Sequence, residues 1–192
     1  MTRAKPMAPE VRRQAIIDAT LPLLHEHGRV TTTKQIADAA GIAEGTIFRV
    51  FESKDELFAA ALEHAFDFGP FIGDLGRIEP DQPLRGRLLD IVTMTQIRFR
   101  GIFGLMASMG MTAPPVAQRH KADARARVGA AMVALVAPDA DALTCTPEDL
   151  VHRLRLLTFS ATHPHISDGQ TLSAAQIVDT ICDGLLKKDT PC

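Results

Sequence analysis

A short segment near the N-terminus carries polar side chains that are suited to hydrogen bonding at a surface. In the sequence EGTIFRV, Glu44, Thr46 and Arg49 share one helical face, opposite the apolar Ile47. A carboxylate, a hydroxyl and a guanidinium can form hydrogen bonds with base edges and phosphates, and the major groove of DNA admits one α-helix. Gly45 has no side chain, so it would let the start of this helix approach DNA closely.

Two helices joined by a tight turn must hold this segment in place. The first of them can be capped by Thr32 or Thr33 and ends at Gly41. The turn is Gly-Ile-Ala, and a short helix is predicted over 44–50. This order is typical of a helix-turn-helix over about 32–51, although an ordinary αα-hairpin with a solvated outer face has the same spacing.

Composition and patterning favour an all-α protein. The chain has 192 residues, of which 46% are hydrophobic and 23% charged, with a net charge of −2. We find no alternating strand pattern in the sequence, and every apolar run is broken well before the roughly 18 residues that a membrane span needs. The N-terminus lacks the apolar core of a secretory signal. We therefore expect a cytoplasmic protein with no membrane contact.

Charge is distributed unevenly along the chain. Residues 1–54 carry eight Lys/Arg and six Asp/Glu, and the remainder carries more acids than bases. Such a balance permits a DNA contact near the N-terminus but does not establish one. Further helices are predicted at 9–27, before the helix-turn-helix, and from Ser53 to about Phe68 after it.

An enzyme is the remote alternative. Cys145 or Ser160 would serve as nucleophile, with His152 or His163 as base, but no nucleophile elbow, phosphate loop or metal-binding pattern accompanies them. The three cysteines are widely spaced, which is typical of reduced cytosolic thiols. We therefore expect no catalysis, metal or cofactor.

The N-terminal region resembles a known family. The Thr-Thr pair before the second helix and the pieces IADAAGI, GTIFRVF and SKDELF occur in the order found in the DNA-binding domain of the tetracycline-repressor (TetR) family. The resemblance implies a DNA-binding domain over 9–67 and a helical effector-binding and dimerisation domain over 68–192. It also implies a homodimer that binds double-stranded operator DNA, in most cases a repressor released by a small-molecule effector.

The resemblance also implies which residues contact DNA. Thr33 and Lys54 match positions that contact phosphate, and the other matching positions read bases or neighbouring phosphates. The full set is Thr32, Thr33, Lys34, Glu44, Gly45, Thr46, Phe48, Arg49 and Lys54. Two departures from the family pattern matter. Ala43 replaces a frequent serine cap, and Phe48 replaces a tyrosine, so it cannot donate a hydroxyl hydrogen bond to phosphate.

The rest of the chain is predicted as helices separated by Pro/Gly-rich breaks. They are expected at 84–101, 102–111, 115–136, 147–162 and 173–187, with a loop or linker at 68–83. Two apolar stripes lie on the last two of these helices. The predicted dimer interface consists of Leu150, Leu154, Leu157, Ala161, Ile177, Val178, Ile181 and Leu185. Both stripes fit a two-fold four-helix packing, or equally the core of a single chain.

A methionine- and phenylalanine-rich segment is the candidate effector site. Methionine adapts to irregular apolar shapes, and ligand pockets are mostly apolar with a few polar groups. The candidate ligand contacts are Met94, Phe99, Phe103, Met106 and Met109, with Thr95, Gln96 and Arg98 as polar groups. These residues predict a small apolar or amphipathic effector. Plain core packing, in a DNA-binding regulator without a ligand, is the alternative.

Overall fold

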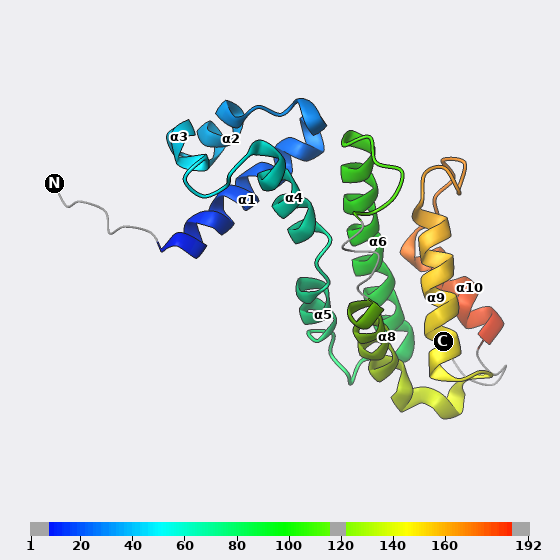
Figure 1. The fold of residues 1–192 in the computed structure, drawn as a ribbon. Helices are drawn as coiled ribbons and strands as arrows, with labels where there is room; N and C mark the ends of the chain where they lie inside the picture. The colour runs from blue at the N-terminus through cyan, green and yellow to red at the C-terminus, as the bar shows by residue number, and fades with distance from the viewer. Residues whose placement is uncertain (1–7, 116–121, 186–192) are drawn as a thin grey trace. The chain divides into compact units, whose positions relative to one another are not determined.

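The computed structural model describes residues 8–115 and 122–185, and it is all-α throughout these ranges, as predicted (Figure 1). The elements are α1 (Pro9–His27), η1 (Gly28–Val30), α2 (Thr33–Ala40), α3 (Glu44–Ile47), α4 (Lys54–Ala65), α5 (Gly69–Leu75), α6 (Leu84–Ser108), α8 (Ala122–Val136), η2 (Ala137–Ala142), α9 (Pro147–Thr162) and α10 (Ala174–Leu185). Residues 116–121 and 186–187, which belong to two of the predicted helices, lie outside the described residues. Among the described helices, none combines the length and the apolar character that crossing a bilayer requires.

The chain divides into two compact units. The N-terminal unit comprises Met1–Phe66 and Gly104–His120, and the C-terminal unit comprises Asp67–Phe103 and Lys121–Cys192. The first boundary lies next to the predicted boundary at residue 67. The return of Gly104–His120 to the N-terminal unit was not foreseen. As a consequence, α6 contributes its first part to one unit and its last turn to the other.

The N-terminal unit is built around α1, which packs against α2 and α4, while α2 packs against α3 (Figure 1). Apolar side chains from all four helices are fully covered: Ile16 and Leu24, Ile36, Ile47 and Leu57. Thr20 is buried among them, and its Oγ donates to the Ile16 carbonyl at 2.7 Å, so the hydroxyl is satisfied within the core.

The short helix α3 is shorter than predicted. The structure ends α3 at Ile47, whereas the sequence predicted a helix to Val50. Ala43 provides no side-chain cap, and the chain tightens after Ile47 into bonds from Arg49 N to Thr46 O at 3.2 Å and from Val50 N to Ile47 O at 3.0 Å. One turn of helix is not stable alone, so α3 depends on the fully buried Ile47 for its position.

The end of α6 packs closely on the end of α1 within the N-terminal unit. Gly28 has a φ of 59°, and a Cβ atom there would collide with the Ser108 carbonyl, so both backbone conformation and space require glycine. Ser108 Oγ donates to the Leu24 carbonyl at 2.7 Å, and Arg29 Nε donates to the Met109 carbonyl at 3.0 Å. The Leu24 carbonyl also accepts from the Gly28 backbone N–H, so the two helix ends share hydrogen bonds as well as space.

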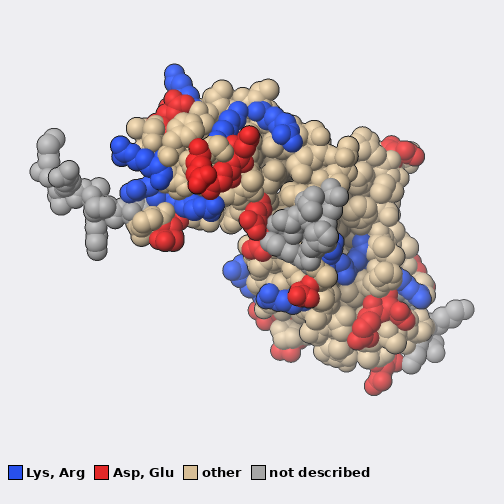
Figure 2. All heavy atoms as spheres, in the orientation of Figure 1, with Lys and Arg blue, Asp and Glu red and all other residues tan. Residues whose placement is uncertain are grey.

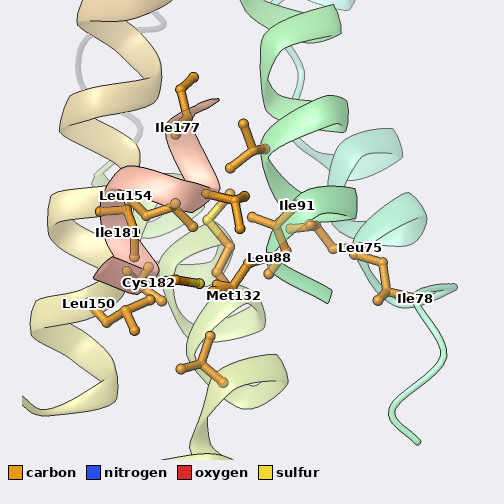
Figure 3. Packing of buried hydrophobic residues seen from close by; sticks show 14 of the residues in the cluster. Leu75, Ile78, Leu88, Ile91, Met132, Leu150, Leu154, Ile177, Ile181 and Cys182 are labelled. Carbon is orange, nitrogen blue, oxygen red and sulfur yellow. The ribbon is translucent and has the colours of Figure 1, made fainter. Parts of the chain in front are cut away.

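The C-terminal unit encloses its own apolar core (Figure 3). Its members come from α5, α6, α8, α9 and α10 and include Leu75, Leu88, Ile91, Met132, Leu150, Leu154, Ile177 and Ile181. Burial of this size supplies the main stabilisation of such a unit. The side chains of this core are buried by contacts within one chain. This burial bears on the two apolar stripes that were predicted for a dimer interface.

The predicted dimer stripes lie mostly in this intrachain core. Six of the proposed interface residues are buried in the single chain: Leu150, Leu154, Ala161, Ile177, Val178 and Ile181. Leu157 is partly buried and packs against the same core, and the side chain of Leu185 lies outside the described residues. These six side chains are already covered within the single chain, and the dimer interface stays a prediction.

Two further predictions about helices were wrong. The predicted loop at 68–83 contains α5, in which Pro70 occupies the first turn, where a proline needs no donor. Phe71 and Leu75 are one helical turn apart and both are buried. The two helices predicted at 84–101 and 102–111 are one helix, α6, of 25 residues. Gly101 lies in its interior, at a cost of about 1 kcal/mol that a long, packed helix tolerates.

Candidate DNA-binding surface

The α2–turn–α3 geometry is fixed by caps at both ends of α2. Thr32 Oγ accepts from Gln35 N at 3.2 Å, and the Gln35 side chain accepts from Thr32 N at 2.7 Å, which is a complete capping box. Gly41 ends the helix with a φ of 65°, and Ile42 N then donates to the Ala37 carbonyl at 3.0 Å. The sequence predicted a cap at Thr32 or Thr33 and a stop at Gly41; the cap is Thr32, and the stop at Gly41 is confirmed.

A side-chain hydrogen bond joins the first residues of α2 and α3. Thr33 Oγ donates to Glu44 Oε1 at 2.5 Å, across eleven positions of sequence. Glu44 is exposed and Thr33 is partly exposed, so both side chains lie at the surface of the unit. The two candidate contact residues are thus held together before any DNA is bound.

Lys54 begins α4 and is oriented by its neighbours. Its Nζ donates to the Arg29 carbonyl at 3.3 Å and lies 5.0 Å from the centroid of the Phe58 ring. Ser53 caps the helix, as predicted, by accepting from Glu56 N at 3.1 Å. The ammonium group is therefore placed beside η1 rather than left free on a flexible stem.

The remaining candidate residues line the outer side of α3 and its neighbouring turn. Phe48 is 51% exposed, and Arg49 and Lys34 are exposed as well, while Thr46 is partly exposed. A Cβ atom at Gly45 would meet nothing within 4 Å, so the fold itself does not require glycine there. An exposed phenylalanine on a polar surface is unfavourable in water, and this is consistent with a face that becomes covered.

Charge on this unit is mixed. Figure 2 shows acidic and basic side chains interspersed on the visible face of the N-terminal helices rather than a continuous basic coat. Glu44, at the start of α3, is close in sequence to three basic candidates: Lys34 on α2, Arg49 in the turn after α3, and Lys54 at the start of α4. Contact with DNA must therefore place the acid away from phosphates.

The predicted effector residues lie in different surroundings. Phe99 and Phe103 stack at 5.6 Å and both meet Phe159 edge-on at 5.4 Å. Met94 instead packs against the core of the C-terminal unit. Met106 and the buried Met109 belong to the N-terminal unit. The five-residue effector site stays a prediction.

Sequence reasoning missed two members of the aromatic group. Phe159, on α9, contacts both phenylalanines of α6, and His163 lies 4.6 Å from the Phe103 ring. Their separation of four positions places them on one helical face, which was a usable signal. Their pairing with α6 depends on the tertiary fold.

Arg98, one of the predicted polar groups, packs against aromatic rings. Its guanidinium lies 4.7 Å from the centroid of Phe68 and 5.5 Å from that of Phe71. Burial lowers the pKa of Arg98, and the negative charge of Asp67 opposes this effect. The contacts tie the segment that precedes and begins α5 to α6 by cation–π attraction.

Comparison with known proteins gives this surface a context. A family model described as "Bacterial regulatory proteins, tetR family" matches residues 16–61, which include α2, α3 and the start of α4. The uncharacterized HTH-type transcriptional regulator YvkB of Bacillus subtilis (strain 168) is 43% identical over 75 residues. That match spans 36% of this chain and only 39% of the relative.

Solved structures share the fold at low sequence identity. A TetR transcription regulator from Haloarcula marismortui is 22% identical with a TM-score of 0.65, covering 92% of this chain and 98% of that one. SmeT, the repressor of the Stenotrophomonas maltophilia multidrug efflux pump SmeDEF, is 20% identical with a TM-score of 0.58, covering 92% and 91%. A second structure of SmeT is a complex with triclosan. Residues 16–61 thus match the helix-turn-helix region of the tetR family of bacterial regulatory proteins, and the all-α fold is shared with solved structures of TetR regulators.

Proposed function

We propose that this regulator binds double-stranded operator DNA as a homodimer, represses transcription from it, and is released by a small apolar or amphipathic effector. The observation that carries the proposal is the outer surface of α3. A helix of four residues is held in place by buried Ile47 and by capped neighbours, and it leaves its polar side chains exposed. A helix docked in this way is suited to enter a major groove.

Each candidate residue has a role that follows from its chemistry. Lys54 binds a phosphate, because an oriented ammonium suits phosphate oxygens, whereas the one hydroxyl proton of Thr33 is donated to Glu44. Arg49 and Thr46 reach base edges, and arginine pairs well with guanine O6 and N7. Phe48 contributes apolar contact, such as with a thymine methyl group, in place of a hydroxyl hydrogen bond. In a homodimer the two copies of α3 would meet half-sites about 34–36 Å apart.

The homodimer would use a face that the intrachain core leaves uncovered. Leu156 on α9 is 56% exposed, although the same helix buries Leu150 and Leu154 on its inner side. Large exposed apolar side chains on a helix are candidates for an interface. We therefore move the proposed contact from the buried stripes to the outer face of α9 around Leu156.

The effector would bind beside the aromatic side chains of α6 and α9. Phe99, Phe103 and Phe159 offer ring faces and edges that suit an apolar, ring-containing molecule. The like-folded SmeT forms a complex with triclosan, which supports a small-molecule effector of this kind. Native mass spectrometry of the purified protein would test it: a co-purifying small molecule supports the effector, and a protein free of ligand that no apolar compound stabilises favours a regulator without one.

Selection of DNA from a random pool by the full-length protein tests the main proposal. The expected result is enrichment of a two-fold symmetric motif whose half-sites are separated by about one helical turn or a multiple of it. Enrichment without any common motif at moderate salt would indicate electrostatic association only, and it would overturn specific operator binding.

A further inference from the structure

Glu44 is an acidic residue on a surface that is proposed to meet a polyanion. It is exposed at the start of α3, between the basic candidates Lys34 and Arg49. A carboxylate is repelled by phosphates, whereas an amino group on a base edge would be a favourable partner for it. We propose that Glu44 selects a cytosine in each half-site by accepting a hydrogen bond from its amino group, and that Thr33 is the positioning residue. This inference rests on the proposed operator binding.

The bond to Thr33 prepares the carboxylate for such a contact. Thr33 Oγ donates to Oε1 of Glu44 at 2.5 Å, which uses part of the accepting capacity of one oxygen. An ionised carboxylate has two oxygens and about four acceptor positions, so Oε2 remains able to accept from a base. Because Thr33 begins α2 and Glu44 begins α3, the bond also limits the rotamers of a side chain that is otherwise solvent-exposed.

The chemistry of the major groove then restricts the base. An ionised carboxylate has no donor, so it is repelled by guanine O6 and N7 and by thymine O4. The donors available there are the amino groups of cytosine and adenine. Adenine presents its N7 acceptor beside its amino group, and this pair suits the mixed amide of Asn or Gln. Cytosine presents its amino group without an adjacent acceptor, so it suits a carboxylate better.

Glu44→Gln is the informative substitution because it keeps the shape of the side chain and the acceptor for Thr33. The second oxygen becomes an amino group, which donates. The preference at the contacted pair should then leave cytosine for a base that presents an acceptor, with a loss of cytosine discrimination of about tenfold. Asp38→Asn is the matched control, because Asp38 is an exposed acid on α2 and the substitution removes the same charge.

The experiment is selection of random DNA by the full-length wild type, Glu44→Gln and Asp38→Asn proteins under one salt condition. The expected result is a C·G pair in each wild-type half-site that only Glu44→Gln loses. The inference is overturned if Glu44→Gln keeps every position as sharp as wild type, or if both variants only bind all sequences more tightly. It is also overturned if the position that changes is an adenine.

The outcomes also distinguish this inference from the proposed function. If the wild type enriches a motif and Glu44→Gln enriches the same motif unchanged, this inference is wrong and the proposed function stands. A wild type without any motif rejects both.

Thr33 is tested by a pair of substitutions. Thr33→Val removes the hydroxyl and keeps the side-chain shape, whereas Thr33→Ser keeps a hydroxyl. A positioning role predicts that Thr33→Val blurs the cytosine preference and that Thr33→Ser restores it. If Thr33→Val lowers affinity for all sequences while the cytosine preference stays as sharp as in wild type, Thr33 binds phosphate only, and its positioning role is wrong.

Discussion

At the scale of single residues, the candidate surface contains two kinds of residue. Some have side chains that hydrogen bonds within the unit hold in place, and others contribute little to the packing of the fold. The Lys54 ammonium and the Glu44 carboxylate each have a hydrogen-bond partner within the unit. Gly45 and Phe48 have no comparable role in the fold, since Gly45 faces open space and Phe48 is half exposed. Substitutions at Gly45 and Phe48 can therefore test DNA binding with little change in the free energy of unfolding.

Gly45→Ala should separate the two properties directly. A Cβ atom at this position meets no neighbour within 4 Å, and alanine favours helix over glycine by about 1 kcal/mol. We expect the free energy of unfolding to stay the same or to rise by up to about 1 kcal/mol, while operator affinity falls because the added methyl group blocks close approach. Thermal unfolding and a DNA titration measure the two effects, and unchanged affinity would show that DNA does not approach Gly45.

Lys54→Ala should weaken binding to every DNA sequence by a similar factor. A phosphate contact carries no base information, and its loss should reduce the slope of log affinity against log salt by about one. The check is a set of titrations at several salt concentrations on operator and on unrelated DNA. An unchanged slope, or a loss confined to one base position, would contradict the phosphate role.

At the scale of elements, backbone contacts between helix ends set the geometry. The last turn of α6 lies against Gly28, and this contact depends on a positive φ and on the missing Cβ atom. Gly101, also in α6, faces open space. Gly28 contacts the end of α6, whereas Gly101 lies within α6 and contacts nothing on that side. Only Gly28 is therefore required by the fold.

Gly28→Ala and Gly101→Ala form a matched pair. Gly28→Ala should lower the free energy of unfolding by about 2 kcal/mol or more, because it combines left-handed backbone strain with a collision against the Ser108 carbonyl. Gly101→Ala should raise it by up to about 1 kcal/mol through helix propensity. Chemical denaturation of both variants is the measurement, and equal stability of the two would contradict the close approach at Gly28.

Local signals explain which elements were predictable. The caps at Thr32 and Ser53 and the stop at Gly41 act within a few residues, so they can be recognised in the sequence. In α5, two glycines and a proline suggest a loop, and only the burial of Phe71 and Leu75 against other helices reverses that preference. Tertiary packing overrides weak local propensity in such segments.

The candidate surface shows the same division. The order of helices and the exposed side chains of α3 could be predicted from spacing and resemblance. The bond between Thr33 and Glu44 could not be, because it needs the turn to bring together residues eleven positions apart. The dimer stripes show a related limit of spacing: a helical stripe shows which face is buried, but not whether the partner belongs to the same chain.

At the scale of the whole molecule, α6 gives the two units a continuous element. It begins at Leu84 in the C-terminal unit, carries Phe99 and Phe103 of the aromatic group, and ends at Ser108 in the N-terminal unit. The proposed effector site and the end of α1 are therefore connected by one hydrogen-bonded helix. Coupling between effector and DNA requires two states that each ligand favours differently.

Leu156→Asp should disrupt the proposed homodimer while leaving the single chain folded. The side chain is 56% exposed, so a carboxylate there is solvated in the monomer but is costly to bury between two copies. Val11→Asp, at the same exposure on α1, is the control. Analytical ultracentrifugation should show a dimer for the control and a monomer for Leu156→Asp. A dimeric Leu156→Asp protein would place the interface elsewhere.

The central claim is that the outer face of α3 binds DNA specifically, and the most direct measurement is a titration of the selected operator with the full-length protein. Arg49→Ala removes a positive charge from that face, and Arg77→Ala removes one from an exposed arginine of the C-terminal unit whose side chain is 79% accessible. We predict that Arg49→Ala weakens operator binding about tenfold or more, while Arg77→Ala stays within about twofold of wild type, as expected for a surface pair of little energetic weight. Equal affinities for the two variants, whether both unchanged or both reduced, would contradict the claim.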